Sequence, residues 1–246
     1  MMIIDKLKQF VGNLFDNDPE IRFACTRGAP HVSPITRIEL ARSVMPEWIK
    51  DQKENSNTDK FLNCPGMSDY AKAGYIIPAW SDMTIKANRG GTVIKYNNNY
   101  NAQETNLNFK MVEPMVPINS SVRGLVTKVP CPWAVFGKSG WSGYLIPAYY
   151  HSSFLKDLFM YPGIIDFDTF HTINFVFTAL HDCEVTIPAG TPLLQLIPFK
   201  REIVRGVCMK GSEDDRDRHT FTYPTLHRSA YRRLFHQKKT FKLEHK

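Results

Sequence analysis

Residues 20–198 consist of short runs of β-branched and aromatic side chains, separated by prolines, glycines and asparagines. Runs of about four to eight such residues, bounded by turn residues, are typical of strands. The predicted strands occupy residues 74–80, 92–96, 107–112, 133–136, 143–147, 172–178, 183–187 and 192–199. This number of short strands predicts an all-β sandwich, barrel or clip. One helix is expected between them, over residues 35–48, where Ile35, Ile38 and Val44 are loosely periodic.

An amphipathic helix is predicted for the N-terminal arm, residues 1–19. Its apolar stripe consists of Ile3, Leu7, Phe10, Val11 and Leu14, and the sequence Asn17-Asp18-Pro19 ends it. A helix with one apolar stripe must bury that stripe on another surface. We expect Leu7, Phe10 and Leu14 to contact a neighbouring subunit.

The C-terminal arm, residues 201–246, carries most of the net positive charge. The 246-residue chain has 31 Lys and Arg against 24 Asp and Glu, a net charge of +7, and this arm alone has 12 basic and 6 acidic residues. The remaining residues are nearly neutral, so we do not expect the β domain to bind a polyanion. The arm predicts a basic amphipathic helix with an apolar side of Tyr231, Leu234 and Phe235 and a basic side of Arg232, Arg233, Lys238 and Lys239.

Two partners for this arm stay open. Its apolar side would pack on a neighbouring subunit, whereas its basic residues would bind nucleic acid or an acidic protein partner. We favour the subunit contact, because the excess of basic residues is modest.

Composition excludes several classes of protein. The chain is 43% hydrophobic, which is too apolar for an intrinsically disordered protein. No apolar run reaches the roughly 18 residues that a membrane helix requires, so no membrane partner is expected. The cysteines are odd in number and form no CxxC pair, which argues against a disulfide framework and a structural zinc site; they are Cys25, Cys64, Cys131, Cys183 and Cys208.

Asp166 and Asp168 are the first candidates for chemistry. They lie two positions apart and suit either a metal site or a turn, and we favour the turn because no third acidic ligand lies nearby in sequence. His151, His171 and His181 occur among the predicted strands without the compact HxH or HxD pair that is typical of iron sites on β scaffolds.

The segment FGKSGWSG, residues 136–143, contains Ser139 and Gly140. Its spacing fits neither the GxSxG nucleophile elbow nor the P-loop, so we expect a turn between two strands. We therefore assign no catalytic residue, no metal and no cofactor to the chain.

Residues 163–199 resemble the third motif region of trimeric dUTPases and dCTP deaminases. The matching residues are Gly163, Ile165, Asp166, Asp168, Ile187, Gly190 and Gln195. Lys138, Ser139 and Gly140 resemble the Arg-Ser-Gly phosphate loop of the same enzymes, and residues 72–79 resemble their first motif. The resemblance implies a β-clip architecture. It also implies that a bound nucleotide would contact Ser139, Gly140, Asp166, Asp168 and Gln195.

The chain departs from these enzymes at several functional positions. Thr169 replaces the Tyr that packs on the deoxyribose, and Lys72 and Ile77 replace the acidic residues of the first motif. Lys138 replaces an Arg that binds phosphate bidentately. The Gly-rich C-terminal arm is replaced by a basic and aromatic one. A fold can persist after its site is lost, so we expect no dUTPase chemistry.

A broader resemblance covers most of residues 20–243. Residues 74–82, 133–147, 162–170, 187–202 and 231–242 are similar to a family of proteins from tailed phages, notably T4-like and marine phages. This implies a viral origin and a role in the virion or its assembly. The expected fold is mainly β, with a β-clip- or sandwich-like domain over residues 20–200 and helical arms at both ends.

The expected function follows from these resemblances and from the arms. We expect a non-enzymatic structural protein of a bacteriophage virion or of virion assembly, found in the virion or the host cytoplasm. It would form a homo-oligomer and contact other virion proteins. The alternative is a dUTPase-like nucleotide-processing enzyme or nucleotide-binding protein.

Overall fold

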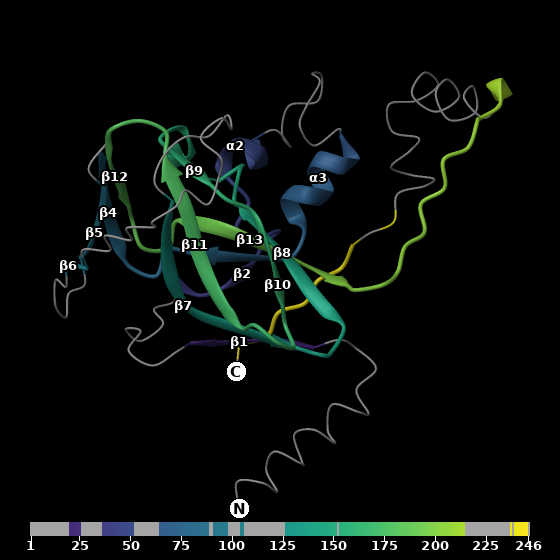
Figure 1. Ribbon diagram of the computed structural model, residues 1–246, viewed down its shortest axis with the longest axis horizontal. Helices are drawn as coiled ribbons and strands as arrows, with labels where there is room; N and C mark the ends of the chain where they lie inside the picture. Colours follow the sequence, from purple (N-terminus) through teal and green to yellow (C-terminus); the bar gives the residue numbers. More distant parts are fainter. Residues whose placement is uncertain are drawn as a thin grey trace, which may run out of the picture. The chain divides into compact units, whose positions relative to one another are not determined.

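The computed structural model describes residues 20–25, 36–51, 64–88, 91–97, 104–105, 126–151, 153–214, 237 and 239–245 (Figure 1). The predicted N-terminal helix falls outside these residues, and so do most of the predicted C-terminal helix and the predicted strand at 107–112. The predicted contact residues outside them are Leu7, Phe10, Leu14, Tyr231, Arg232, Arg233, Leu234, Phe235 and Lys238.

The strands of the described residues form three sheets (Figure 1). Their strands are β1 (Ile21–Cys25), β2 (Glu39–Leu40), β3 (Tyr75–Pro78), β4 (Asp82–Asn88), β5 (Gly91–Asn97), β6 (Glu104–Thr105), β7 (Thr127–Gly137), β8 (Trp141–Pro147), β9 (Leu158–Met160), β10 (Gly163–Asp166), β11 (Thr172–Ala179), β12 (Cys183–Ile187) and β13 (Pro192–Lys200). The first sheet has the order β1-β7-β11-β9, the second contains β10-β8-β13-β3, and the third has the order β12-β4-β5-β6. The prediction of a mainly β fold is confirmed.

Alternating burial places these strands around a core. In β4 every second side chain is buried, namely Met83, Ile85 and Ala87, while the residues between them face outward. In β11 the aromatic rings of Phe175 and Phe177 are completely buried. A period of two is what a strand requires when one of its faces packs on a core.

The chain divides into two compact units. Unit 1 comprises Met1–Ile38 and Ile76–Arg201, and unit 2 comprises Glu39–Tyr75 and Glu202–Lys246. Unit 1 contains most strands and a short 3₁₀ helix, η4 (Ser153–Lys156). The sequence analysis did not separate residues 39–75 from the β domain.

In its described residues, unit 2 contains helices α2 (Glu47–Lys50) and α3 (Pro65–Lys72), and residues 239–245 pack beside them. The Tyr75 hydroxyl donates to the Lys242 carbonyl over 3.0 Å, and the Tyr75 ring lies edge-on to Phe241 with centroids 6.2 Å apart. No helix in the described ranges is long and apolar enough to cross a membrane.

The prediction of a helix over residues 35–48 is wrong. The structure has irregular turns there, the short strand β2, and then α2, which begins only after Pro46. Ile38 and Ala41 are apolar because both side chains are buried, and their three-residue spacing only resembles a helical period. Helix α3 was not predicted. Among those of its residues whose burial is described, Ala71 is the buried apolar one, so no apolar stripe marks the helix in the sequence.

Candidate functional site

The turn between β7 and β8, which belong to different sheets, carries the residues that resemble a phosphate loop. The Trp141 N–H donates to the Lys138 carbonyl over 3.2 Å, which closes a tight turn around Ser139 and Gly140. Gly140 has a φ of +83°, a backbone conformation that side-chain-bearing residues rarely adopt. The prediction of a turn between two strands in this segment is confirmed.

The buried ring of Phe167 holds the backbone that follows β10. It packs where Gly143 leaves room, since a Cβ on Gly143 would lie 2.8 Å from Phe167 Cζ. The Phe167 N–H donates to the Trp141 carbonyl, and its own carbonyl accepts from the Gly137 N–H, both over 3.1 Å. The residues on either side of Phe167 are therefore fixed next to the β7–β8 turn.

Asp166, the last residue of β10, pairs with Ser142 of β8 in the antiparallel register. Paired residues on neighbouring strands point to the same face of the sheet. The Ser142 hydroxyl donates to Asp166 Oδ1 over 2.6 Å, and Ser142 is completely buried. One oxygen of the Asp166 carboxylate thus has a partner inside the sheet.

Asp168 and Arg201 complete the cluster. Asp168 Oδ2 accepts hydrogen bonds from the Gly140 N–H over 3.0 Å and from Arg201 Nη2. Arg201 Nη1 lies 3.4 Å from Asp166 Oδ1, and the Arg201 N–H donates to the Gly140 carbonyl over 2.7 Å. One guanidinium therefore bridges both carboxylates. We call Gly140, Ser142, Asp166, Asp168 and Arg201 the Arg201 clamp.

The clamp holds Asp168 in its ionised form. The hydrogen bond from the Gly140 N–H, and after it Arg201, lowers the pKa of the Asp168 carboxyl below its ordinary value of 3.8, although desolvation opposes them. Its Oδ1 atom is buried and has no hydrogen-bond partner within the described residues. Two carboxylates and one guanidinium give the clamp a net charge of −1.

Three of the five predicted nucleotide-contact residues, Gly140, Asp166 and Asp168, come together in the clamp. Ser139 lies in the same turn with an exposed side chain. Gln195 is buried on β13, where it pairs with Ile146, while Phe199, four positions further along, pairs with Ser142. Four strand positions correspond to about 13 Å, so Gln195 lies well away from the clamp along the strand.

The sequence does not predict Arg201 or Ser142 as members of the site. Arg201 follows a predicted strand and stands between Lys200 and Glu202, so neither a motif nor its charge distinguishes it. Ser142 immediately precedes the predicted strand at 143–147, but its partner strand β10 is not among the strands predicted above. The bridging contact depends on the β13–β8 pairing, which the sequence does not reveal.

Lys239, predicted to meet an acidic partner, is the member of its basic group that the structure describes. Its Nζ atom lies 2.6 Å from Asp69 Oδ2 of α3, within unit 2. This contact places Lys239 against an acidic residue of its own chain. The other basic residues of that group lie outside the described ranges.

The three histidines lie apart from the clamp and serve local contacts. His171 stacks on Phe136 with ring centroids 4.3 Å apart, and its Nδ1 is 3.0 Å from the Val135 carbonyl. His181 Nε2 is 3.3 Å from Asp157 Oδ1, and burial lowers the pKa of His151. In the part of the chain that the structure describes, no three His, Cys, Asp or Glu residues are grouped as a metal site requires.

The comparisons with known proteins give phage dUTPases as structural neighbours. No family model and no curated protein matches the chain. A mutant dUTPase from phage phi11 of S. aureus is 14% identical with a TM-score of 0.34, and a mutant dUTPase of Staphylococcus bacteriophage 80alpha is 12% identical with a TM-score of 0.34. Each alignment covers 80% of this chain and 99% of the other chain. At this level of similarity, the activity of these dUTPases does not transfer to this chain.

Proposed function

We propose that the chain is a non-enzymatic structural protein of a bacteriophage virion or of its assembly, acting through contacts between subunits and with other virion proteins. The observation that carries this proposal is the Arg201 clamp. The acidic residues that resemble a nucleotide site are engaged by the chain's own guanidinium, serine hydroxyl and backbone N–H.

The clamp opposes nucleotide chemistry for an electrostatic reason. A carboxylate that binds Mg²⁺ or activates a water molecule must offer a free oxygen to it. Asp168 Oδ2 and Asp166 Oδ1 are both bound to Arg201, and Asp166 Oδ1 also accepts from Ser142. A metal ion bound at the second oxygen of either carboxylate would lie close to the Arg201 guanidinium, whose positive charge opposes its binding.

The alternative, a dUTPase-like nucleotide-binding or nucleotide-processing protein, is favoured by one observation. Gly140, Asp166 and Asp168 converge even though they come from two separate segments, and Asp168 Oδ1 is buried without a hydrogen-bond partner within the described residues. In this alternative, Arg201 would swing away and bind phosphate. The two candidate functions therefore differ in what Arg201 contacts when nucleotide is present.

Calorimetric titration with dUTP and dCTP, with and without Mg²⁺, separates these functions. We expect no heat of binding and no release of pyrophosphate. Magnesium-dependent turnover that is abolished in Asp168→Asn, with an unchanged circular dichroism spectrum, would establish the enzyme instead. Asp182→Asn, the same change at an exposed carboxylate between β11 and β12, serves as the matched control.

The structural role has its own test in purified phage particles. Mass spectrometry of the particles, taken from the phage that encodes this chain, is expected to detect it at a fixed ratio to the other particle proteins. Its absence from finished particles and from isolated assembly intermediates would overturn the proposal.

A further inference from the structure

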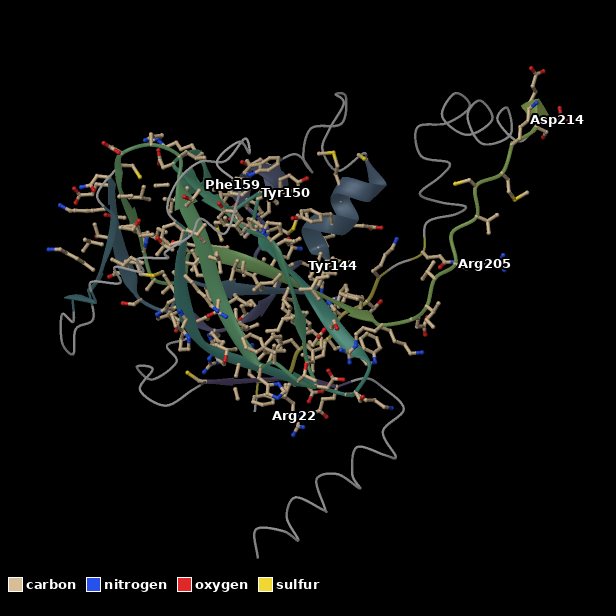
Figure 2. All side chains as sticks on the ribbon, in the orientation of Figure 1. Arg22, Tyr144, Tyr150, Phe159, Arg205 and Asp214 are labelled. Atoms are coloured by element: carbon tan, nitrogen blue, oxygen red, sulfur yellow. The ribbon has the colours of Figure 1, made fainter. Side chains whose placement is uncertain are left out.

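The segment that follows the clamp, residues 203–209, leaves its apolar side chains in water. It runs as an extended chain that includes Arg205 (Figure 2), and it makes no hydrogen bond or ion pair within the described residues. Ile203 is completely exposed, and Val204, Val207 and Met209 are 88%, 64% and 83% exposed. A cluster of exposed large apolar side chains is the mark of an interaction surface. We call residues 203–209 the exposed segment.

The edge strands of unit 1 differ in how they are protected against pairing with another chain. On β1, Arg22 points outward (Figure 2) and lies 3.7 Å from Glu20. On β12, the exposed Glu184 forms an ion pair of 2.9 Å with Lys86 of β4. Charged side chains on an edge strand oppose the addition of a further strand.

Strand β10 lacks this protection. Within the described residues it pairs only with β8, and its outer end consists of Gly163 and Ile164, of which Ile164 is 62% exposed. The one charged residue of the strand, Asp166, is engaged by the clamp. Strand β10 therefore offers free backbone groups beside an apolar side chain, which is what an added strand requires.

An apolar surface continues from this edge across the sheet. Ile164 pairs with Tyr144 on β8, so the two side chains share one face. The Tyr144 ring stacks on Phe199 of β13 with centroids 4.5 Å apart, yet 47% of Tyr144 stays exposed. A strand laid along β10 would cover Ile164 and part of this surface with its own apolar side chains.

We propose that the exposed segment of one copy adds as a strand to β10 of a second copy. Both surfaces belong to this chain, and within the part of the chain that the structure describes neither is covered in one copy, as the exposure of Ile203 and Ile164 shows. A donor and an acceptor on the same chain form a head-to-tail interface, which builds rings or filaments of identical subunits. The inference rests on the proposed function, because it identifies the subunit contact through which the protein acts.

The Arg201 clamp gives the exposed segment a fixed starting point. The Arg201 N–H is bound to the Gly140 carbonyl, and its side chain is bound to Asp166 and Asp168, immediately before the segment begins. Anchoring one end of a binding segment reduces the conformational entropy that binding must remove. The acidic pair thus acts as an anchor for the segment that reaches the next subunit.

Light scattering coupled to size-exclusion chromatography tests the pairing. We expect an oligomer for the unaltered chain, and a dissociation constant raised by about tenfold or more in Ile203→Asp/Val207→Asp and in Ile164→Lys. Ile203 and Val207 share one face of an added strand, so each variant places charge in the apolar contact. Leu180→Lys is the matched control, since Leu180 is a 47% exposed apolar residue outside β10. An oligomer mass unchanged in both test variants would overturn the inference.

Cys208, an exposed native cysteine within the segment, allows a second test. In a background with Cys25→Ser and Cys64→Ser, we expect a short bismaleimide to cross-link Cys208 to Ile164→Cys between copies, and not to Arg22→Cys on the protected edge. Equal cross-linking at both positions would contradict the choice of β10.

The two proposals fail in different ways. A chain that is monomeric at every concentration but present in phage particles would overturn the strand addition and leave the structural function standing. A chain that forms the β10 contact but is absent from particles and assembly intermediates would do the opposite.

Discussion

Gly143 provides a quantitative test of how the second sheet supports the clamp. An alanine Cβ at this position would lie 2.7 Å from Leu196 Cδ1 and 2.8 Å from Phe167 Cζ. Both neighbours are at most 1% exposed, so neither can turn into solvent to make room. Overpacking of this kind costs about 1–3 kcal/mol, and we expect Gly143→Ala to lower the free energy of unfolding by that amount.

The same clash predicts a coupling between two positions. Phe167→Leu removes the ring atoms that the new methyl group would meet, at a cost of its own of about 1–2 kcal/mol. We expect Gly143→Ala to cost at least about 1 kcal/mol less in the Phe167→Leu background than in the unaltered chain. The double variant should therefore lose less free energy of unfolding than the sum of the losses in the two single variants.

Urea unfolding followed by circular dichroism measures all four members of this cycle. Gly163→Ala is the control, because no atom lies within 4 Å of the position of its added Cβ. We expect that control to change stability by less than about 0.5 kcal/mol. Costs for Gly143→Ala and Phe167→Leu that add within about 0.5 kcal/mol would refute the packing described for Phe167.

Three further predictions follow from single contacts. The pKa of Asp168 is lowered in the folded chain, so the ionised carboxylate stabilises the fold above about pH 3.8, and this stabilisation is lost as the pH falls through the pKa of the folded state. Arg201→Ala should therefore raise the pKa of Asp168 in an NMR titration and make the free energy of unfolding depend less on pH in acid. Gly140→Ala should cost about 1–2 kcal/mol in urea unfolding, because φ is +83°. Tyr75→Phe removes the hydroxyl that donates to Lys242 and should cost about 1 kcal/mol, with faster amide exchange in residues 239–245.

The strands were largely predictable because their signal is local. Strands β5, β8, β11, β12 and β13 lie at the expected positions, since each is a short β-branched or aromatic run between turn residues. Strand β4 was not predicted, although its alternation of buried and exposed residues is regular. Its sequence, DMTIKAN, contains few β-branched residues, so the composition does not indicate a strand. The two-residue alternation becomes clear only from which side chains are buried.

The clamp was only partly predictable because it joins segments that are distant in sequence. Asp166 and Asp168 were recognised by their spacing and by the motif around them. Arg201 reaches them only because β13 and β10 both pair with β8 and end at the same side of the sheet. A register between strands separated by tens of residues depends on tertiary packing, which no local pattern encodes.

The composition of unit 2 from two distant stretches has a consequence for synthesis on the ribosome. Tyr75 bonds to Lys242, 167 positions later, and Asp69 pairs with Lys239, 170 positions later. At a translation rate of about 5–20 residues per second, residues 39–75 would wait about 10–30 s for these partners to be made. During that time the buried side chains of this stretch lack the contacts that residues 239–245 supply. Unit 2 is therefore open to chaperones, and to premature contact with a neighbouring copy, until those residues have been made.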